Sequence, residues 1–256
     1  MSERITSRRN RLVLHYKSLL TDKKYRYENR AFVCDGIKLL NEAIAESVII
    51  RSALIDERIS EELFSGREPR DFRVYTAPRE IIEAVSTLST PQGVLFECEM
   101  PAPRKIAGER FILLDGLQDT GNIGTIIRCA DALSIDAVIC DGCADIYNPK
   151  VVRSAMGSLF RVNAVNTKLP DAIPMLHDMK IPVYAARLEK DSADVSSVDL
   201  TKCAVIIGNE GAGVRDVIAG LCDGSIVIPM SGRAESLNAA LAAAIIMYEM
   251  TRGKSR

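Results

Sequence analysis

The sequence is poor in the residues that build common hydrolytic and metal centres. It has two histidines in 256 residues, His15 and His177, and neither lies in a glycine-rich or acidic motif. A Ser-His-Asp triad uses a histidine as its general base, and a multi-histidine metal site needs several of them. We therefore expect neither kind of centre, and no bound metal.

Cysteine is present without a clear metal or disulfide pattern. The seven cysteines are odd in number, and Cys140 and Cys143 form the one C-x-x-C pair. A tetrahedral metal site would need two further ligands, and a thioredoxin-like pair would open a helix. This pair instead follows the apolar run DAVIC. We interpret the cysteines as ordinary thiols in a reduced, cytosolic protein.

Long hydrophobic runs are absent as well. No segment reaches the ~18 apolar residues that span a bilayer, and the opening segment MSERITSRRNR is charged, with no apolar signal core. The chain is 47% hydrophobic and 26% charged, as in soluble globular proteins, and its 28.1 kDa suffices for two domains. We expect a cytoplasmic protein without a membrane partner.

The net charge of −1 hides a basic N-terminus. The first thirty residues carry nine basic and three acidic side chains, a net charge of 9 − 3 = +6. Such a cluster can hold RNA phosphates, and interleaved tyrosines can stack on bases. The predicted phosphate contacts are Arg8, Arg9, Arg11, Lys24 and Arg26, and the tyrosines are Tyr16, Tyr25 and Tyr27. A solvated helix face is the alternative interpretation.

The chain divides near residue 100. Residues 100–108 hold two prolines, two bases and little apolar content, which is typical of a linker. We predict a small α/β domain over 1–100, a linker over 101–108 and a second domain over 109–256. In the second domain, near-continuous Val/Ile/Leu strands alternate with helices, which indicates a parallel sheet covered on both faces.

Three loops that follow predicted strands of the second domain combine glycines with polar side chains. The first places Asn122 beside Gly124 and puts Arg128 one helical turn further on. Arg128 lies off the apolar stripe of that helix, which consists of Ile123, Ile126, Ile127 and Ala130. A capped helix with a surface arginine is the alternative.

The second loop, residues 207–214, enters a helix from a strand and so suggests a phosphate cradle. Its glycines are spaced GxxGxG, unlike the GxGxxG of dinucleotide sites, and the chain has no GxxxxGK[ST] motif. Glu210 inside the loop would repel a pyrophosphate but would suit a cationic ligand or a hydroxyl donor. A plain strand–helix turn is the alternative.

The third loop, residues 228–238, leads into the last predicted helix. Ser236 suits the N-cap of that helix, which is the alternative to a role in the site. Twelve of the fourteen residues from Leu237 to Met250 are apolar. A helix that is apolar all round is buried on more than one side. We expect this helix to lie in the core of the sheet and against a second subunit.

Together these loops resemble the three signature motifs of the SpoU/TrmH family of RNA ribose 2′-O-methyltransferases, in the SPOUT class. The likeness is carried by N-x-G-x-x-x-R at residues 122–128, GNEGAG at 208–213, and IPM and SLN at 228–230 and 236–238. Segments such as YRYENRAFVCDG also resemble the family's RNA substrate-binding domain, which is similar to a small ribosomal protein. One departure is Gln118-Asp119-Thr120, where relatives often have Asp-Pro before the asparagine.

The resemblance implies a homodimer and a parallel sheet whose S-adenosylmethionine site is tied in a trefoil knot. The residues it implies for cofactor binding are Gly208, Ile228 and Leu237. It makes Arg128 the catalytic residue, with Asn122, Glu210, Ser236 and Asn238 orienting it, the substrate or the neighbouring loop. A guanidinium is a poor general base, so we expect Arg128 to stabilise charge and anchor a phosphate.

Three other functions stay open at this point. A separate N-terminal domain favours 23S ribosomal RNA as the substrate, and transfer RNA is the alternative within the family. A non-catalytic RNA-binding protein would not need Arg128, Glu210 and Asn238 together. Another nucleotide-dependent enzyme would need a dinucleotide or Walker motif, and the chain has neither.

Overall fold

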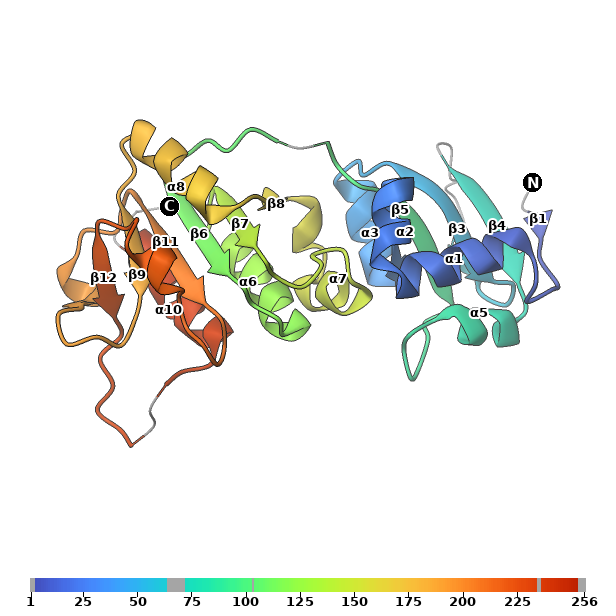
Figure 1. Ribbon diagram of the computed structural model, residues 1–256. Coiled ribbons are helices and arrows are strands. Elements are labelled where there is room, and N and C mark those ends of the chain that lie inside the picture. The colour runs from blue at the N-terminus through green and yellow to red at the C-terminus, as the bar shows by residue number, and fades with distance from the viewer. Residues whose placement is uncertain (1–2, 64–71, 103, 234–235, 253–256) are drawn as a thin grey trace. The chain divides into compact units, whose positions relative to one another are not determined.

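The computed structural model describes residues 3–63, 72–102, 104–233 and 236–252. The chain forms two compact units, each built on its own sheet (Figure 1). The first unit is Met1–Ala102 with Tyr147–Phe160, and the second is Pro103–Ile146 with Arg161–Arg256. The predicted boundaries differ in one respect, because residues 147–160 pack with the first unit. There the rings of Tyr147 and Phe32 lie 4.9 Å apart between centroids.

The first unit holds a mixed five-stranded sheet in the order β1-β4-β3-β5-β2. Strand β3 pairs parallel with β4 and antiparallel with β5. The strands are β1 (Glu3–Arg4), β2 (Ala31–Asp35), β3 (Ile50–Asp56), β4 (Arg73–Ala77) and β5 (Val94–Glu99). The helices are α1 (Arg11–Thr21), α2 (Lys23–Asn29), α3 (Ile37–Ala45), α4 (Ser60–Leu63), α5 (Arg79–Val85) and α7 (Pro149–Ala155), with a 3₁₀ turn at Ser158–Phe160.

Helix α1 shows how the basic N-terminal segment folds. Asn10 begins it by accepting a hydrogen bond from the amide of Leu12. Val13, Tyr16, Leu19 and Leu20 recur at helical spacing and are buried in the core of this unit. The charged residues between them are left at the surface or at its margin.

The second unit holds a seven-stranded sheet in the order β10-β12-β9-β11-β6-β7-β8. All of its strand pairs are parallel, which confirms the predicted sheet. The strands are β6 (Arg110–Asp115), β7 (Ala137–Asp141), β8 (Ala164–Asn166), β9 (Val183–Ala186), β10 (Ala193–Asp194), β11 (Cys203–Gly208) and β12 (Gly224–Val227). The helices are α6 (Thr120–Ala132), α8 (Leu169–Asp178), α9 (Asp216–Ala219) and α10 (Ala239–Thr251), with a 3₁₀ turn at Val195–Ser197.

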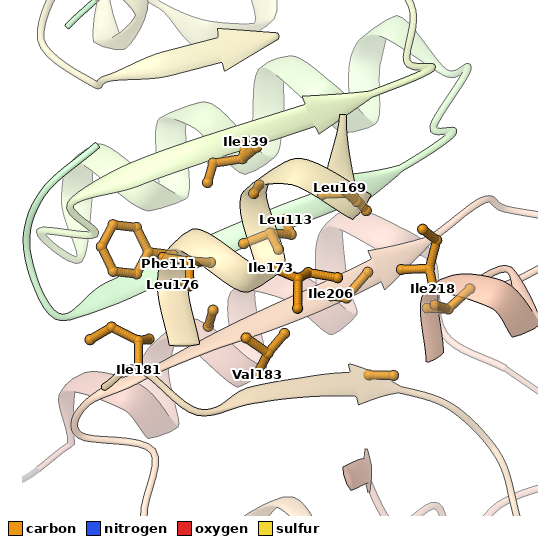
Figure 2. Packing of buried hydrophobic residues seen from close by; sticks show 14 of the residues in the cluster. Phe111, Leu113, Ile139, Leu169, Ile173, Leu176, Ile181, Val183, Ile206 and Ile218 are labelled. Carbon is orange, nitrogen blue, oxygen red and sulfur yellow. The ribbon is translucent and has the colours of Figure 1, made fainter. Parts of the chain in front are cut away.

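Helices cover both faces of this sheet. On one face, Ile173 and Leu176 of α8 pack with Phe111 and Leu113 of β6 (Figure 2). On the other face, α6 and α10 pack against each other and the central strands. The predicted stripe of α6 is fully buried, as expected. Helix α8 is not among the predicted helices, and its sequence holds Pro170 and Pro174. Proline in a first helical turn needs no hydrogen-bonded N–H, so Pro170 is compatible with the helix start.

Helix α10 buries one side and exposes the other. Ala240, Ala243, Ile246, Met247 and Met250 are buried. Leu241 and Tyr248 are 58% and 57% exposed, and Ile245 is 39% exposed. The expected burial in the sheet's core is therefore observed for one side only. In the part of the chain that is described, no helix has both the length and the hydropathy needed to cross a bilayer.

Candidate functional site

The three loops singled out in the sequence lie in the second unit. Parallel strands place their carboxyl ends at one edge of a sheet, which is where open α/β sheets bind ligands. The loops leave β6, β11 and β12, respectively. Strands β6 and β11 are direct neighbours, so the first two loops start side by side.

The loop after β11 closes tightly on itself. The amide of Asn209 donates to the carbonyl of Gly213 at 3.0 Å, and the amide of Gly213 donates back at 2.9 Å. The Asn209 side chain accepts from the amides of Gly211 and Ala212. A Cβ atom on Gly208 would lie 2.1 Å from the backbone of Gly213 and Val214. Glycine at 208 is thus required by the loop itself, before any ligand binds.

Glu210 fastens this loop to the loop after β6. Its carboxylate accepts hydrogen bonds from the amides of Gln118 at 3.3 Å and Asp119 at 3.1 Å. The Nδ2 group of Asn122 donates to it at 3.1 Å. Burial raises the pKa of Glu210, but these donors outweigh it and hold that pKa below its ordinary value. Glu210 therefore acts as an ionised anchor between two loops.

Asn122 also reaches the third loop. Its Oδ1 atom accepts from Nδ2 of Asn238 at 2.9 Å. The Oδ1 atom of Asn238 accepts from the amides of Ala240 and Leu241, so Asn238 is the N-cap of α10. The alternative interpretation of Ser236 as the N-cap of this helix is therefore wrong. Ser236 is instead an exposed residue that lines the cleft described next.

The loops after β11 and β12 border an open cleft of about 730 Å³. Gly208, Ile228 and Leu237 line it, as do Glu210, Ser236 and Asn238. Two parts of its wall are not among the predicted site residues: residues 186–189 at the end of β9, and Ala242 and Ile246 of α10. The first could have been found from its position at a predicted strand end. A cleft of this size lined by apolar residues and a few polar groups suits a small organic ligand.

Arg128 stands apart from this network. It is exposed on α6, off the buried stripe, and does not line the cleft. It makes no hydrogen bond or ion pair with any residue that the structure describes. The structure thus joins Asn122, Glu210 and Asn238 but leaves Arg128 free for an external partner.

The basic residues of the N-terminus divide into two groups. Arg8, Arg9, Arg11 and Lys24 are exposed. Arg26 is only 2% exposed, and its guanidinium donates to the carbonyl of Leu19 at 2.6 Å. The prediction that Arg26 contacts RNA phosphates is therefore wrong, because the side chain is used inside the unit.

The aromatic and sulfur residues are placed as follows. Tyr16 is fully buried and donates its hydroxyl to Ser52, so it offers no stacking surface, whereas Tyr27 is exposed. Cys140 lies in strand β7 and Cys143 follows that strand, and both are free thiols. Among the described residues, no group of three or more His, Cys, Asp or Glu side chains is arranged to hold a metal ion.

The geometry of the loops agrees with comparisons to known proteins. The profile of the SpoU rRNA Methylase family matches residues 109–248, which include all three loops and the cleft. The chain belongs to the SpoU methylase family. Residues 13–95 of this SpoU-family chain match the MRM3-like substrate binding domain.

Relatives of this SpoU-family chain match along nearly its whole length. It is 35% identical to the 23S rRNA (guanosine(2553)-2′-O)-methyltransferase RlmP of Bacillus subtilis, over 97% of this chain and 99% of the relative. It is also 35% identical to the 23S rRNA (uridine(2479)-2′-O)-methyltransferase of Streptomyces viridochromogenes, over 98% and 92%. The AdoMet-bound rRNA methyltransferase of Sinorhizobium meliloti has a similar structure, with 30% identity, a TM-score of 0.86 and 98% coverage of both chains.

Proposed function

We propose that this protein is an S-adenosylmethionine-dependent RNA methyltransferase that methylates a ribose 2′-hydroxyl of 23S ribosomal RNA. The observation that carries the proposal is the cleft beside the Gly208–Val214 loop, joined through Glu210 and Asn122 to Asn238. The named activities of two relatives with near-complete coverage support it.

The cleft fits this cofactor in size and character. Its 730 Å³ lies within the ~300–1,000 Å³ typical of ligand sites. Backbone around Gly208 can approach a ligand closely, and Ile228 and Leu237 offer apolar surface for an adenine ring. The charged lining residues are Glu189, Glu210 and Arg187, an acidic balance that suits a sulfonium cation.

The chemistry divides between the cofactor and the protein. When bound, S-adenosylmethionine supplies a methyl group to which the ribose 2′-oxygen forms a bond, in line with the breaking carbon–sulfur bond. Arg128 stabilises the charge that develops on the 2′-oxygen as its proton leaves, and it anchors a phosphate of the RNA. Its lack of a partner among the described residues supports this role, because the guanidinium is free to bind the substrate.

The other predicted residues hold the site in shape. Glu210 already accepts four hydrogen bonds from protein donors, so we assign it to loop anchoring rather than to proton transfer. Asn122 and Asn238 fix the entry to α10 against the loop after β6. Ser236 is exposed in the cleft wall, where its hydroxyl can contact the substrate.

The first unit supplies RNA contacts through Arg8, Arg9, Arg11 and Lys24. The two bacterial relatives named above modify a guanosine and a uridine, respectively, at similar distance from this chain. Shared catalytic machinery with different target bases supports a separate surface for target selection. An exposed basic cluster in the first unit provides such a surface. Ribosomal RNA as substrate also agrees with a cytoplasmic location.

A homodimer and a knot complete the proposal. The exposed apolar side of α10, with Leu241, Ile245 and Tyr248, supports burial against a second copy of the chain. Strand β12 lies outside β9 and β11, yet α10 returns to pack on α6 and β6. This return of the chain from β12 to the centre of the sheet supports the trefoil knot that the resemblance implies.

Incubation with methyl-labelled S-adenosylmethionine and separated 23S, 16S and transfer RNA tests the function. We expect label in 23S RNA, at one nucleotide whose 3′ bond resists alkaline hydrolysis, as a 2′-O-methyl group makes it. Label in transfer RNA alone would show that the substrate is transfer RNA, the alternative within the family. Binding of RNA without any transfer would support the non-catalytic alternative.

A further inference from the structure

Two buried carboxylates lie side by side at the carboxyl edge of the second sheet. Asp115 ends β6 and Asp141 ends β7, and the two are register partners. Their exposed fractions are 1% and 3%. Two carboxylates that have lost their hydration repel each other unless cations and hydrogen-bond donors satisfy both.

Arg215 meets this need for both residues at once. Its backbone amide and its Nε atom donate to the two carboxylate oxygens of Asp115, at 2.8 and 2.6 Å. One of its terminal nitrogens donates to Asp141 at 2.8 Å. Lys168 adds an ion pair to Asp141 at 3.1 Å. The planar fork of arginine is suited to bridging two carboxylates in this way, whereas lysine is a point charge.

The ionisation of Asp141 agrees with this arrangement. Burial raises the pKa of Asp141, but the hydrogen bonds from Arg215 and Lys168 outweigh it and hold that pKa below its ordinary value. Asp141 is therefore ionised near neutral pH.

The bridge stands at the exit of the Gly208–Val214 loop. Arg215 follows Val214 directly, and Glu210 fastens the middle of the same loop to the amides of Gln118 and Asp119. Asp115 lies just before those two residues in the chain. The Nδ2 group of Asn209 also donates to the carbonyl of Gly116 at 2.8 Å. The loop is therefore tied to the segment 115–119 at three points, through Asn209, Glu210 and Arg215.

We propose that Arg215 is a positioning residue that holds the Gly208–Val214 loop in its ligand-binding shape by bridging Asp115 and Asp141. This inference rests on the proposed function, because it assigns that loop to S-adenosylmethionine. Arg215 does not line the cleft, so it acts through the loop backbone.

The test compares Arg215→Lys with wild type in the full-length protein. Titration calorimetry with S-adenosylhomocysteine should show an affinity at least ~10-fold weaker, because one of the charge-assisted bonds at the loop exit is lost. Hydrogen exchange at the amides of 209 and 213 should speed up in the ligand-free protein. The KM for S-adenosylmethionine should rise while kcat at saturation changes little.

Arg161→Lys is the matched control. Arg161 makes a similar paired contact with Asp131 in the same unit, at 2.9 and 2.8 Å, but lies outside the cleft wall. It should leave both affinity and exchange unchanged. Should Arg215→Lys fail to fold, Asp115→Asn removes one acceptor while reducing the buried charge, and the same losses are expected.

Unchanged affinity and unchanged exchange in a folded Arg215→Lys protein would overturn the proposal, as would equal changes in Arg161→Lys. A fall in melting temperature with neither loop exchange nor affinity altered would also overturn it, since that marks a purely structural ion cluster. If wild type binds no S-adenosylhomocysteine, the proposed function fails, and the exchange data still decide whether Arg215 holds the loop.

Discussion

Asn122 and Asn238 are 116 residues apart in the sequence and are joined by a hydrogen bond of 2.9 Å between their side-chain amides. The polarity of this bond is fixed from both ends. Asn122 uses its Nδ2 group on the carboxylate of Glu210, and Asn238 uses its Oδ1 atom to cap α10. One amide pair thus connects the loops after β6 and β11 with the start of the last helix.

Asn122→Asp should break this connection while keeping the side-chain shape. The new carboxylate would face Glu210 where a donor stood at 3.1 Å, and like charges repel at that distance. We expect S-adenosylhomocysteine to bind at least ~10-fold more weakly in calorimetry, because a charge-assisted bond has become a repulsion. Asn163→Asp is the control, since Asn163 donates to the Lys105 carbonyl away from the cleft. Equal affinity for wild type and Asn122→Asp would show that the hydrogen bonds of Asn122 do not contribute to ligand binding.

Much of the site could be predicted from local sequence. Apolar strands that stop at glycine and polar residues mark the loops, and parallel strands bring such loops to one edge. Gly208, Ile228 and Leu237, which the family resemblance implied, all line the cleft. The stripe of α6 also followed from its helical spacing.

Other features depend on contacts distant in sequence. Ser236 and Asn238 are both good N-cap residues, and the sequence does not show which of them caps the helix. In the structure Asn238 accepts from the amide of Ala240, and its Nδ2 group is held by Asn122. Arg26 looks exposed by its charge, but the fold of α2 turns it onto the carbonyl of Leu19. The bridge from Arg215 to Asp115 spans 100 residues and has no local signal.

The pH dependence of the first unit should depend on Glu97, which is 5% exposed. Burial raises its pKa, but hydrogen bonds from His15 and Ser52 and the charge of Arg51 outweigh this and lower it below 4.5. A lowered folded pKa means that the stabilisation is complete above about pH 4.5 and is lost as pH falls through the folded value. Glu97→Gln should therefore lower the calorimetric melting temperature at pH 7, with a difference that shrinks below pH 4.5.

The control for this experiment is Glu57→Gln. Glu57 forms an exposed ion pair with Arg4, and such pairs contribute little. A Glu97→Gln protein as stable as wild type at pH 7 would show that the buried network does not stabilise the unit.

The exposed arginines of the N-terminus should contribute to RNA affinity through phosphate contacts. Replacing Arg8 and Arg9 with alanine should reduce the slope of log affinity against log salt by about 1.4 to 1.8, at ~0.7–0.9 per contact. Cofactor binding should be unaffected. The control replaces Lys180 and Lys202, two exposed lysines of the second unit, with alanine. An identical slope for both double variants and wild type would show that Arg8 and Arg9 do not contact RNA phosphates.

The exposed side of α10 should control assembly. Leu241→Glu places a charge on a residue that is 58% exposed in the single chain, so it should fold normally and separate the dimer. Light scattering should then give half the wild-type mass. Leu14→Glu, on a residue 50% exposed in the first unit, should leave the mass unchanged. A monomeric mass for the wild-type protein in light scattering would show that the proposed homodimer is wrong.

Substitution of Arg128 tests the proposed methyl transfer most directly. The cleft is assigned to cofactor binding, whereas Arg128 is assigned to the chemical step. The measurement is the single-turnover rate of methyl transfer to 23S ribosomal RNA at saturating cofactor, for wild type, Arg128→Lys and Arg128→Ala. If Arg128 is catalytic, Arg128→Ala should bind S-adenosylhomocysteine with unchanged affinity and transfer methyl groups at least ~100-fold more slowly. That is the usual cost of losing one transition-state contact. Arg128→Lys should also be slow, because it keeps the charge without the planar fork. Transfer by Arg128→Ala at the wild-type rate would show that Arg128 is not catalytic.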